Sequence, residues 1–280
     1  MYCRLDCLHA APDSARSAVV FIHGFPDSPE MFAAYATPAE RQQPWLRGRS
    51  LYAFAFPNRH THPDFPPLSA LRQGALAREF AALLDEAAGR SPTGRLVIIA
   101  HDWGATYTWQ YARQRRQPPI EKLVALSVGS SFRYDFGEHG LRALTWLYGV
   151  WFGAAWYVPA LRGLVARSIV AYAGYRSATA ADLWRDAYHY WDRPAWLAQA
   201  PSFLLGWRGR QPEYLDFPFP VLYLRSPLDR IASTAAFERA LDERPDCRRV
   251  ILADANHWFP EQQSERVLAE IRTFLADEPR

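Results

Sequence analysis

The sequence predicts an α/β fold, built on a mostly parallel sheet with helices covering both faces. Short apolar runs rich in β-branched and aromatic residues recur along the chain, and segments with helical spacing of apolar residues separate them. Continuous apolar runs are typical of parallel strands buried on both faces. The chain has 280 residues, enough to bury the core of one large domain or of one domain with an insertion.

Each element is expected where the apolar pattern begins and a turn residue ends it. The expected strands are 18–22, 51–56, 96–100, 123–128, 221–224 and 250–252. The expected helices are 75–88, 106–115 and 265–275. Pro57 ends the second strand and Gly89 ends the first helix. Strands that alternate with helices in this way favour a parallel sheet.

The alternation stops between residues 132 and 217. This interval is rich in Trp, Tyr and Ala, has no convincing strand, and lies between two expected sheet strands. We interpret it as a helical cap (lid), residues 132–217, inserted into a core of residues 1–131 and 218–280. Residues 143–161 carry no charge and approach the ~20 residues that span a bilayer. Their glycines, proline and polar-tipped aromatics favour a buried helix lining an apolar cavity, so membrane contact is not expected.

The charge and cysteine content of the chain bear on which partners and which cell compartment to expect. The net charge is only +3, Lys122 is the single lysine, and no basic block stands out, so a nucleic-acid partner is not expected. Cys3, Cys7 and Cys247 form an odd number without metal-ligand spacing, which suits reduced thiols. Charge near the N-terminus, where a secretory signal needs an apolar stretch, makes a cytoplasmic location the expectation.

A metal site is not expected either. His60 and His62 lie close to Asp64, but their turn-rich segment Pro-Asn-His-Thr-His-Pro explains them without a ligand role. We therefore expect neither a metal nor a cofactor, and the sequence indicates no oligomeric state.

The segment Ala100-His101-Asp102-Trp103-Gly104 directly follows the apolar strand 96–100. A strand followed by small-x-nucleophile-x-small is the pattern of a nucleophile elbow, a sharp turn around which only small neighbours fit. Serine is the usual nucleophile, and here the position holds Asp102. A carboxylate is better suited to attack a saturated carbon than to acylate itself, so the pattern predicts displacement at an alkyl centre.

Other candidate groups follow strands whose carboxyl ends form the ligand-binding edge of such a sheet. Asp229 follows strand 221–224, His257 follows strand 250–252, and His23-Gly24-Phe25-Pro26 follows strand 18–22. The order nucleophile, acid, histidine suits this architecture.

Each of these residues also has an ordinary interpretation. Asp102 alone could cap a helix, His257 could pack against its aromatic neighbour, and Asp229 could make a turn. Asp254 and Asp135 are rivals for the acid.

With these residues, the chain resembles the α/β-hydrolase superfamily over residues 15–277. It most resembles the epoxide hydrolase and haloalkane dehalogenase branch, whose elbow commonly reads His-Asp-Trp-Gly. The resemblance implies that Asp102 is the nucleophile, His257 the general base and Asp229 its orienting acid. It also implies an oxyanion hole made by the backbone N–H groups of Phe25 and Trp103. In this chemistry an alkyl-enzyme ester forms, and a water activated by the histidine hydrolyses it.

The cap residues bear on which electrophile is attacked. Opening an epoxide gives an alkoxide that needs a proton donor, and the resemblance places donors near Tyr148 and at Tyr188 or Tyr190. Expelling a halide needs N–H donors instead, and tyrosines can also simply pack. We expect a small apolar epoxide opened to a diol. The alternatives are a haloalkane dehalogenase, a less specific α/β-hydrolase, or a binding protein. The expected substrate contacts are His23, Trp103, Trp151 and Trp258.

The chain departs from the family pattern at three places. The usual Asp-x-x-Gly-x-Gly is replaced by Phe56-Pro57-Asn58-Arg59-His60. Ala100 stands where glycine is more usual, and the loop carrying Asp229 lacks its common glycine. These departures indicate a divergent member.

Overall fold

A seven-stranded sheet forms the centre of the molecule, and six of its strands are parallel. The computed structural model describes residues 1–11, 15–57, 67, 69–130, 154, 158–161, 163–165, 167–168, 214–229 and 233–276. The strands are β1 (Arg4–His9), β2 (Ala18–Ile22), β3 (Leu51–Ala55), β4 (Leu96–His101), β5 (Ile120–Leu126), β6 (Val221–Arg225) and β7 (Arg248–Ile251). Their order across the sheet is β1-β3-β2-β4-β5-β6-β7, with β1 antiparallel to β3. The predicted fold class is confirmed.

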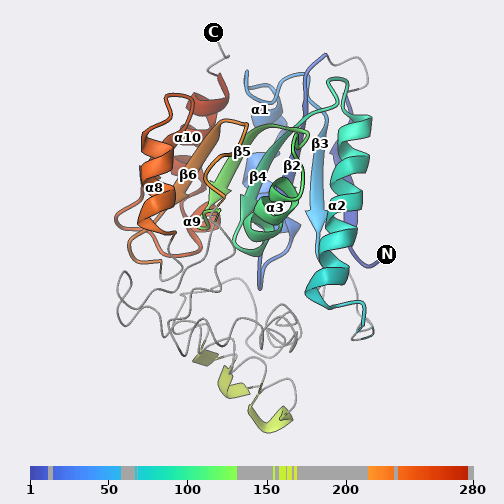
Figure 1. Ribbon diagram of the computed structural model, residues 1–280, viewed down its shortest axis with the longest axis vertical. Helices are drawn as coiled ribbons and strands as arrows, with labels where there is room; N and C mark the ends of the chain where they lie inside the picture. The colour runs from blue at the N-terminus through green and yellow to red at the C-terminus, as the bar shows by residue number, and fades with distance from the viewer. Residues whose placement is uncertain are drawn as a thin grey trace.

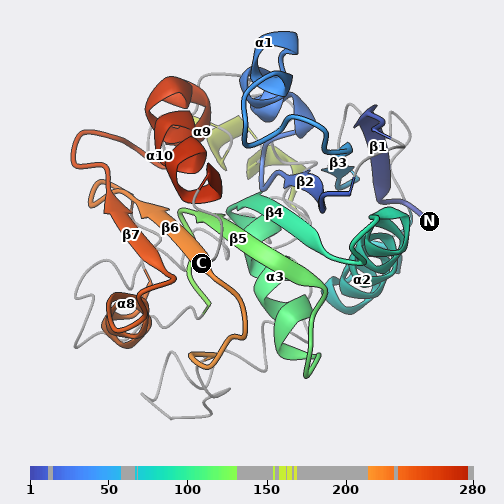
Figure 2. The same ribbon diagram turned by 90° about the horizontal axis from the view of Figure 1, so that it is seen from above.

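Helices lie on both faces of the sheet (Figures 1 and 2). The α-helices are α1 (Pro38–Arg41), α2 (Gln73–Arg90), α3 (Trp103–Arg113), α8 (Ala235–Asp242), α9 (Phe259–Gln262) and α10 (Ser264–Ala276). Two 3-10 helices are η1 (Pro29–Tyr35) and η3 (Pro159–Leu161). In the view from above, α2, α3 and α8 lie on one face, whereas α1 and α10 lie on the other.

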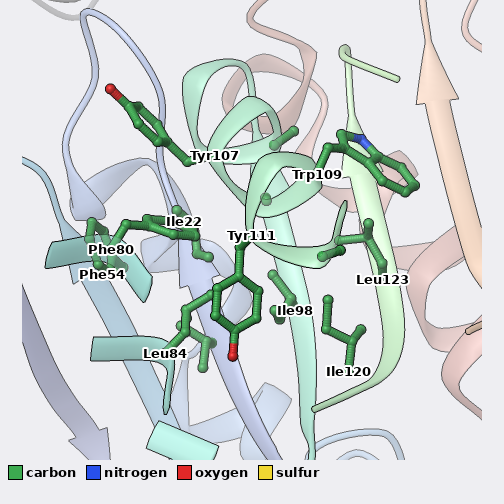
Figure 3. Close-up of a cluster of buried hydrophobic side chains, with 14 of the residues drawn as sticks. Ile22, Phe54, Phe80, Leu84, Ile98, Tyr107, Trp109, Tyr111, Ile120 and Leu123 are labelled. Atoms are coloured by element: carbon green, nitrogen blue, oxygen red, sulfur yellow. The ribbon is translucent and has the colours of Figure 1, made fainter. Parts of the chain in front are cut away.

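The core consists of two apolar clusters because successive strand residues point to opposite faces. On one face, Ile22 and Ile98 pack with Phe80 of α2 and Tyr107 of α3 (Figure 3). On the other, strand residues such as Phe21 pack against η1, α9 and α10. Burying a side chain the size of Phe80 contributes on the order of 2–3 kcal/mol. The strands are thereby fixed, and their carboxyl ends form a rigid edge.

The observed elements overlap every expected strand and helix, with shifted ends. The clearest addition is β1, an edge strand whose mixed polar pattern gives no apolar run. The expected strand 123–128 ends at Leu126, and the helix expected from residue 106 begins at Trp103. Both shifts come from sharp backbone turns at the candidate site.

Most of the predicted cap, residues 132–217, lies outside the described residues, so its boundaries remain a prediction. Before residue 214, the described parts of this interval are Ala154, residues 158–161 with η3, residues 163–165 and residues 167–168. Within the described part of the chain, no helix has both the length and the hydropathy to cross a membrane.

Candidate active site

Asp102 occupies a sharp turn between β4 and α3. Its backbone angles, φ 50° and ψ −118°, belong to a region that residues other than glycine rarely adopt. Such a conformation costs on the order of 1–3 kcal/mol and persists only where the surroundings impose it. Here the backbone N–H of Asp102 donates to the carbonyl of Leu126 at 3.3 Å, and its carbonyl accepts from Thr106 N–H at 2.9 Å. This is the geometry expected of the predicted elbow.

Two glycines make room for the turn. A Cβ on Gly24 would lie 2.5 Å from the Cβ of Asp102, and one on Gly104 would lie 2.5 Å from the carbonyl oxygen of His23. Both distances are far below van der Waals contact, so only a hydrogen can occupy either position. Gly104 fills the second small position of the elbow, as its sequence pattern requires.

The carboxylate of Asp102 is held by backbone donors. Its Oδ2 accepts a hydrogen bond from Phe25 N–H at 2.9 Å, and the N–H of Trp103 also donates to the carboxylate. Burial raises the pKa of Asp102, whereas the neighbouring His257 and these two N–H groups act to lower it. The two predicted oxyanion-hole residues thus lie together around one carboxylate.

His257 lies between Asp102 and Asp229. Its Nδ1 is 2.8 Å from Oδ2 of Asp229, and its Nε2 is 3.8 Å from Oδ1 of Asp102. Burial by itself would lower the pKa of His257, but the charges of Asp229, Asp102 and Asp27 outweigh burial and raise it to about 9. The three residues predicted as nucleophile, base and acid are therefore brought together.

Ser127 belongs to this group, although the sequence did not predict it. Its Oγ lies 2.9 Å from Nδ1 of His257 and donates a hydrogen bond to Oδ2 of Asp229. It directly follows β5, and its φ is 77°. The expected strand 123–128 contained Ser127, so its place at the ligand-binding edge became clear only because β5 ends at Leu126.

His101 packs against the ring of His257 and binds its backbone. It is fully buried at the end of β4, its Nε2 donates to the backbone carbonyl of His257 at 3.0 Å, and the two rings are 4.7 Å apart. Burial and the charge of His257 hold the pKa of His101 well below its usual value. The ring is therefore a neutral donor that fixes the loop carrying His257.

Asp27 is a further acid that sequence reasoning missed. Burial, together with the charge of Glu261, raises its pKa to about 7, while the Ser28 N–H and His257 act to lower it. In the sequence, the one signal for Asp27 is its position two residues after Phe25, which was expected to lie at the site.

Two of the residues predicted to contact substrate, His23 and Trp258, are buried beside the site. His23 is buried; its Nδ1 donates to the Gly24 carbonyl at 2.8 Å and its Nε2 accepts from Phe56 N–H at 3.1 Å. Trp258 is also buried, with its ring edge-on to His257 at 4.8 Å. Their contacts with substrate stay a prediction. Trp103 is partly buried and its ring lies 6.0 Å from that of Tyr107; its contact with substrate also stays a prediction.

Of the remaining candidates, the structure describes Asp254, whereas eight others lie outside the described residues. Asp254 is exposed and pairs with Arg266 at 2.5 Å, away from Nδ1 of His257, so it is not the acid. The candidates that lie outside the described residues are Tyr148, Trp151, Tyr188, Tyr190, Asp135, His60, His62 and Asp64. Among the described residues, no group of three or more His, Cys, Asp or Glu side chains is placed to hold a metal ion.

Comparison with known proteins identifies the family of the chain. The model of the alpha/beta hydrolase family matches residues 19–270. The chain belongs to the alpha/beta hydrolase family. No curated protein sequence matches this hydrolase.

Solved structures similar to this alpha/beta hydrolase include epoxide hydrolases and an esterase. A mutant epoxide hydrolase from Bacillus megaterium, bound to a naphthyloxy-propanediol product, has 15% identity and a TM-score of 0.64, with 98% of this chain and 97% of that chain covered. Epoxide hydrolase A from Mycobacterium thermoresistibile has 20% identity and a TM-score of 0.60, with 99% and 96% covered. A carboxylesterase from Bacillus subtilis has 15% identity and a TM-score of 0.61, with 99% and 88% covered. At these identities the likeness shows the fold.

Proposed function

We propose that this alpha/beta hydrolase opens an apolar epoxide to a diol through an ester between Asp102 and the substrate. The observation that carries the proposal is an aspartate in the strained elbow position, with Oδ2 held by Phe25 N–H and Oδ1 facing His257. A hydrolase that acylates a hydroxyl nucleophile would have serine there. The epoxide hydrolases among the similar structures support this choice of substrate class.

In the first step, Oδ1 of Asp102 attacks a carbon of the epoxide and the C–O bond of the ring breaks. Because Oδ2 is held by backbone donors, Oδ1 is the oxygen that forms the new bond. The alkoxide that leaves takes up a proton. The expected donors are the cap tyrosines Tyr148 and Tyr188 or Tyr190.

In the second step, His257 takes a proton from water and the hydroxide attacks the carbonyl carbon of the ester. The oxyanion develops on the oxygen that faces Phe25 and Trp103, whose N–H groups each stabilise it by about 3 kcal/mol. Collapse of the intermediate breaks the ester C–O bond, the departing alkoxide takes the proton of the new carboxyl group to complete the diol, and the carboxylate is restored. The proton on His257 returns through solvent to the group that protonated the first alkoxide.

Charge coupling links the two steps. The negative charge of Asp102 helps to raise the pKa of His257 to about 9. Ester formation removes that charge, so the pKa of His257 falls and the imidazolium releases its Nε2 proton to solvent. The neutral imidazole can then accept a proton from the attacking water. The reaction of Asp102 with substrate thus prepares His257 for hydrolysis of the ester.

The deciding experiment is multiple turnover in heavy-oxygen water, followed by mass analysis of the peptide that contains Asp102. Naphthyl glycidyl ether is the first substrate, because it would give the diol that one similar structure binds. Heavy oxygen should enter the carboxylate of Asp102. Diol formation with an unlabelled peptide would contradict the covalent route, and Asp102→Ala should give no turnover.

Halide-bearing analogues of the same aryl ether test the alternative activity. Release of halide without opening of any epoxide would assign a haloalkane dehalogenase instead. Turnover of aryl esters alone would assign an esterase.

A further inference from the structure

Ser127 holds an unfavourable backbone conformation in a fully buried position. Its φ is 77°, in the left-handed region, and its side chain is 0% exposed. A residue with a Cβ pays roughly 1–2 kcal/mol for this conformation, whereas glycine adopts it at almost no cost. Strain of this kind, seen in a structure, points to a function for the side chain.

The neighbouring strand β6 holds the backbone of Ser127 through two hydrogen bonds. Its N–H donates to the carbonyl of Leu224 on β6 at 2.8 Å, and its carbonyl accepts from the hydroxyl of Tyr223 at 3.2 Å. The Tyr223 hydroxyl in turn accepts from Ser233 Oγ at 2.6 Å. The position of Oγ is therefore determined by the sheet and does not depend on a mobile loop.

The hydroxyl of Ser127 lies beside both partners of the acid–histidine pair. Its single proton goes to Oδ2 of Asp229, so its lone pairs face the N–H at Nδ1 of His257, 2.9 Å away. Asp229 accepts from the same N–H at 2.8 Å. One donor therefore points between two acceptors, and the imidazole is fixed in rotation and in tautomer.

We propose that Ser127 is a positioning residue for hydrolysis of the alkyl-enzyme ester. This inference rests on the proposed function. Hydrolysis requires Nε2 of His257 to be unprotonated and directed at water while Nδ1 keeps its proton. When Nε2 takes a proton from water, the imidazolium formed is stabilised by two acceptors in place of one. Attack of Asp102 on the epoxide uses no base, so Ser127 acts on the second step alone.

The test separates the two steps by rapid quenching and intact-mass analysis of the ester on Asp102, with naphthyl glycidyl ether as the probe. Ser127→Gly removes the hydroxyl and also relieves the backbone strain, so this variant should fold and melt at a temperature no lower than wild type. Ester formation should stay within about twofold of wild type, and ester hydrolysis should slow by about tenfold, the effect of one hydrogen bond to a charged group. The ester should therefore accumulate.

Ser130→Ala is the matched control. Ser130 lies three residues further along, is also buried, and its Oγ has no hydrogen-bond partner among the described residues. This variant should keep both rates. Ser127→Ala, which keeps the strained backbone, should slow hydrolysis as Ser127→Gly does.

The outcomes are distinct. Ester hydrolysis at the wild-type rate in Ser127→Gly would overturn the role of Ser127 while leaving the proposed function intact. Equal slowing of both steps with a lower melting temperature would assign Ser127 a structural role only, and would also overturn the inference. A wild-type enzyme that forms no ester with any epoxide would remove the proposed function and this inference together.

Discussion

Nε2 of His257 lies 3.8 Å from Oδ1 of Asp102, which is too long for a direct hydrogen bond. The other ring nitrogen is 2.8 Å from Asp229. The imidazole is thus anchored on the side away from the carboxylate that is expected to react. This asymmetry leaves Oδ1 of Asp102 to attack substrate in one step and Nε2 of His257 to take a proton in the next.

Replacing His257 with Gln should trap the ester. Glutamine cannot take a proton from water at neutral pH, whereas Asp102 keeps its carboxylate and its backbone donors. We expect one equivalent of covalently bound substrate, seen as an increase in the intact mass, and multiple turnover reduced by at least about 100-fold. An unmodified protein after prolonged incubation with a substrate that wild type consumes would contradict the ester.

Replacing Asp102 with Asn should lower the pKa of His257 from about 9, because one of the charges that raise it is removed. NMR titration of the imidazole resonances measures this shift and needs no substrate. Asp254→Asn is the control, since Asp254 is exposed and paired with Arg266. Equal pKa values in wild type and Asp102→Asn would remove the proposed charge coupling between the two steps.

Replacing Gly24 with Ala should disable the site, because the new Cβ would lie 2.5 Å from Asp102 Cβ and 2.6 Å from its Oδ2. Displacement of the carboxylate by a fraction of an ångström to one ångström should cost about 100-fold in kcat/KM. Overpacking should also cost about 1–3 kcal/mol of unfolding free energy. In contrast, Gly89→Ala meets no atom within 4 Å and should stabilise α2 by about 0.5–1 kcal/mol without changing activity.

The stability of the protein should depend on pH through Asp27. Its pKa in the fold is about 7, raised first by burial, against an ordinary value of 3.8. The fold therefore favours the protonated acid, and this contribution is complete below about pH 4 and is lost as the pH rises through about 7.

Asp27→Asn removes the ionisation. The variant should be more stable than wild type by roughly 4 kcal/mol at pH 8, since a pKa raised from 3.8 to about 7 corresponds to about 1.4 kcal/mol per unit, and nearly equal to it at pH 4. Urea unfolding at both pH values measures the difference. The same change in unfolding free energy at both would show that the burial of this acid is not what makes stability depend on pH.

The sequence predicted the sheet well because its strands are local patterns. Buried parallel strands need apolar β-branched residues, and the runs at Ala18–Ile22 and Leu96–His101 are such patterns. The edge strand β1 was missed because it is partly exposed and mixes charged with apolar residues. The ends of β5 and α3 were misplaced because the left-handed turns at Ser127 and Asp102 leave no mark in hydrophobic periodicity.

By itself, the sequence determined the elbow, since a strand, two small residues and an aspartate between them are all within one short segment. It also gave the order of the loops that reach the carboxyl edge of the sheet. The tertiary structure alone decided between Asp229 and Asp254, and brought Ser127 and His101 to His257. These contacts join residues 28, 130 and 156 positions apart in the chain. Their closeness depends on strand order and register, which no local pattern contains.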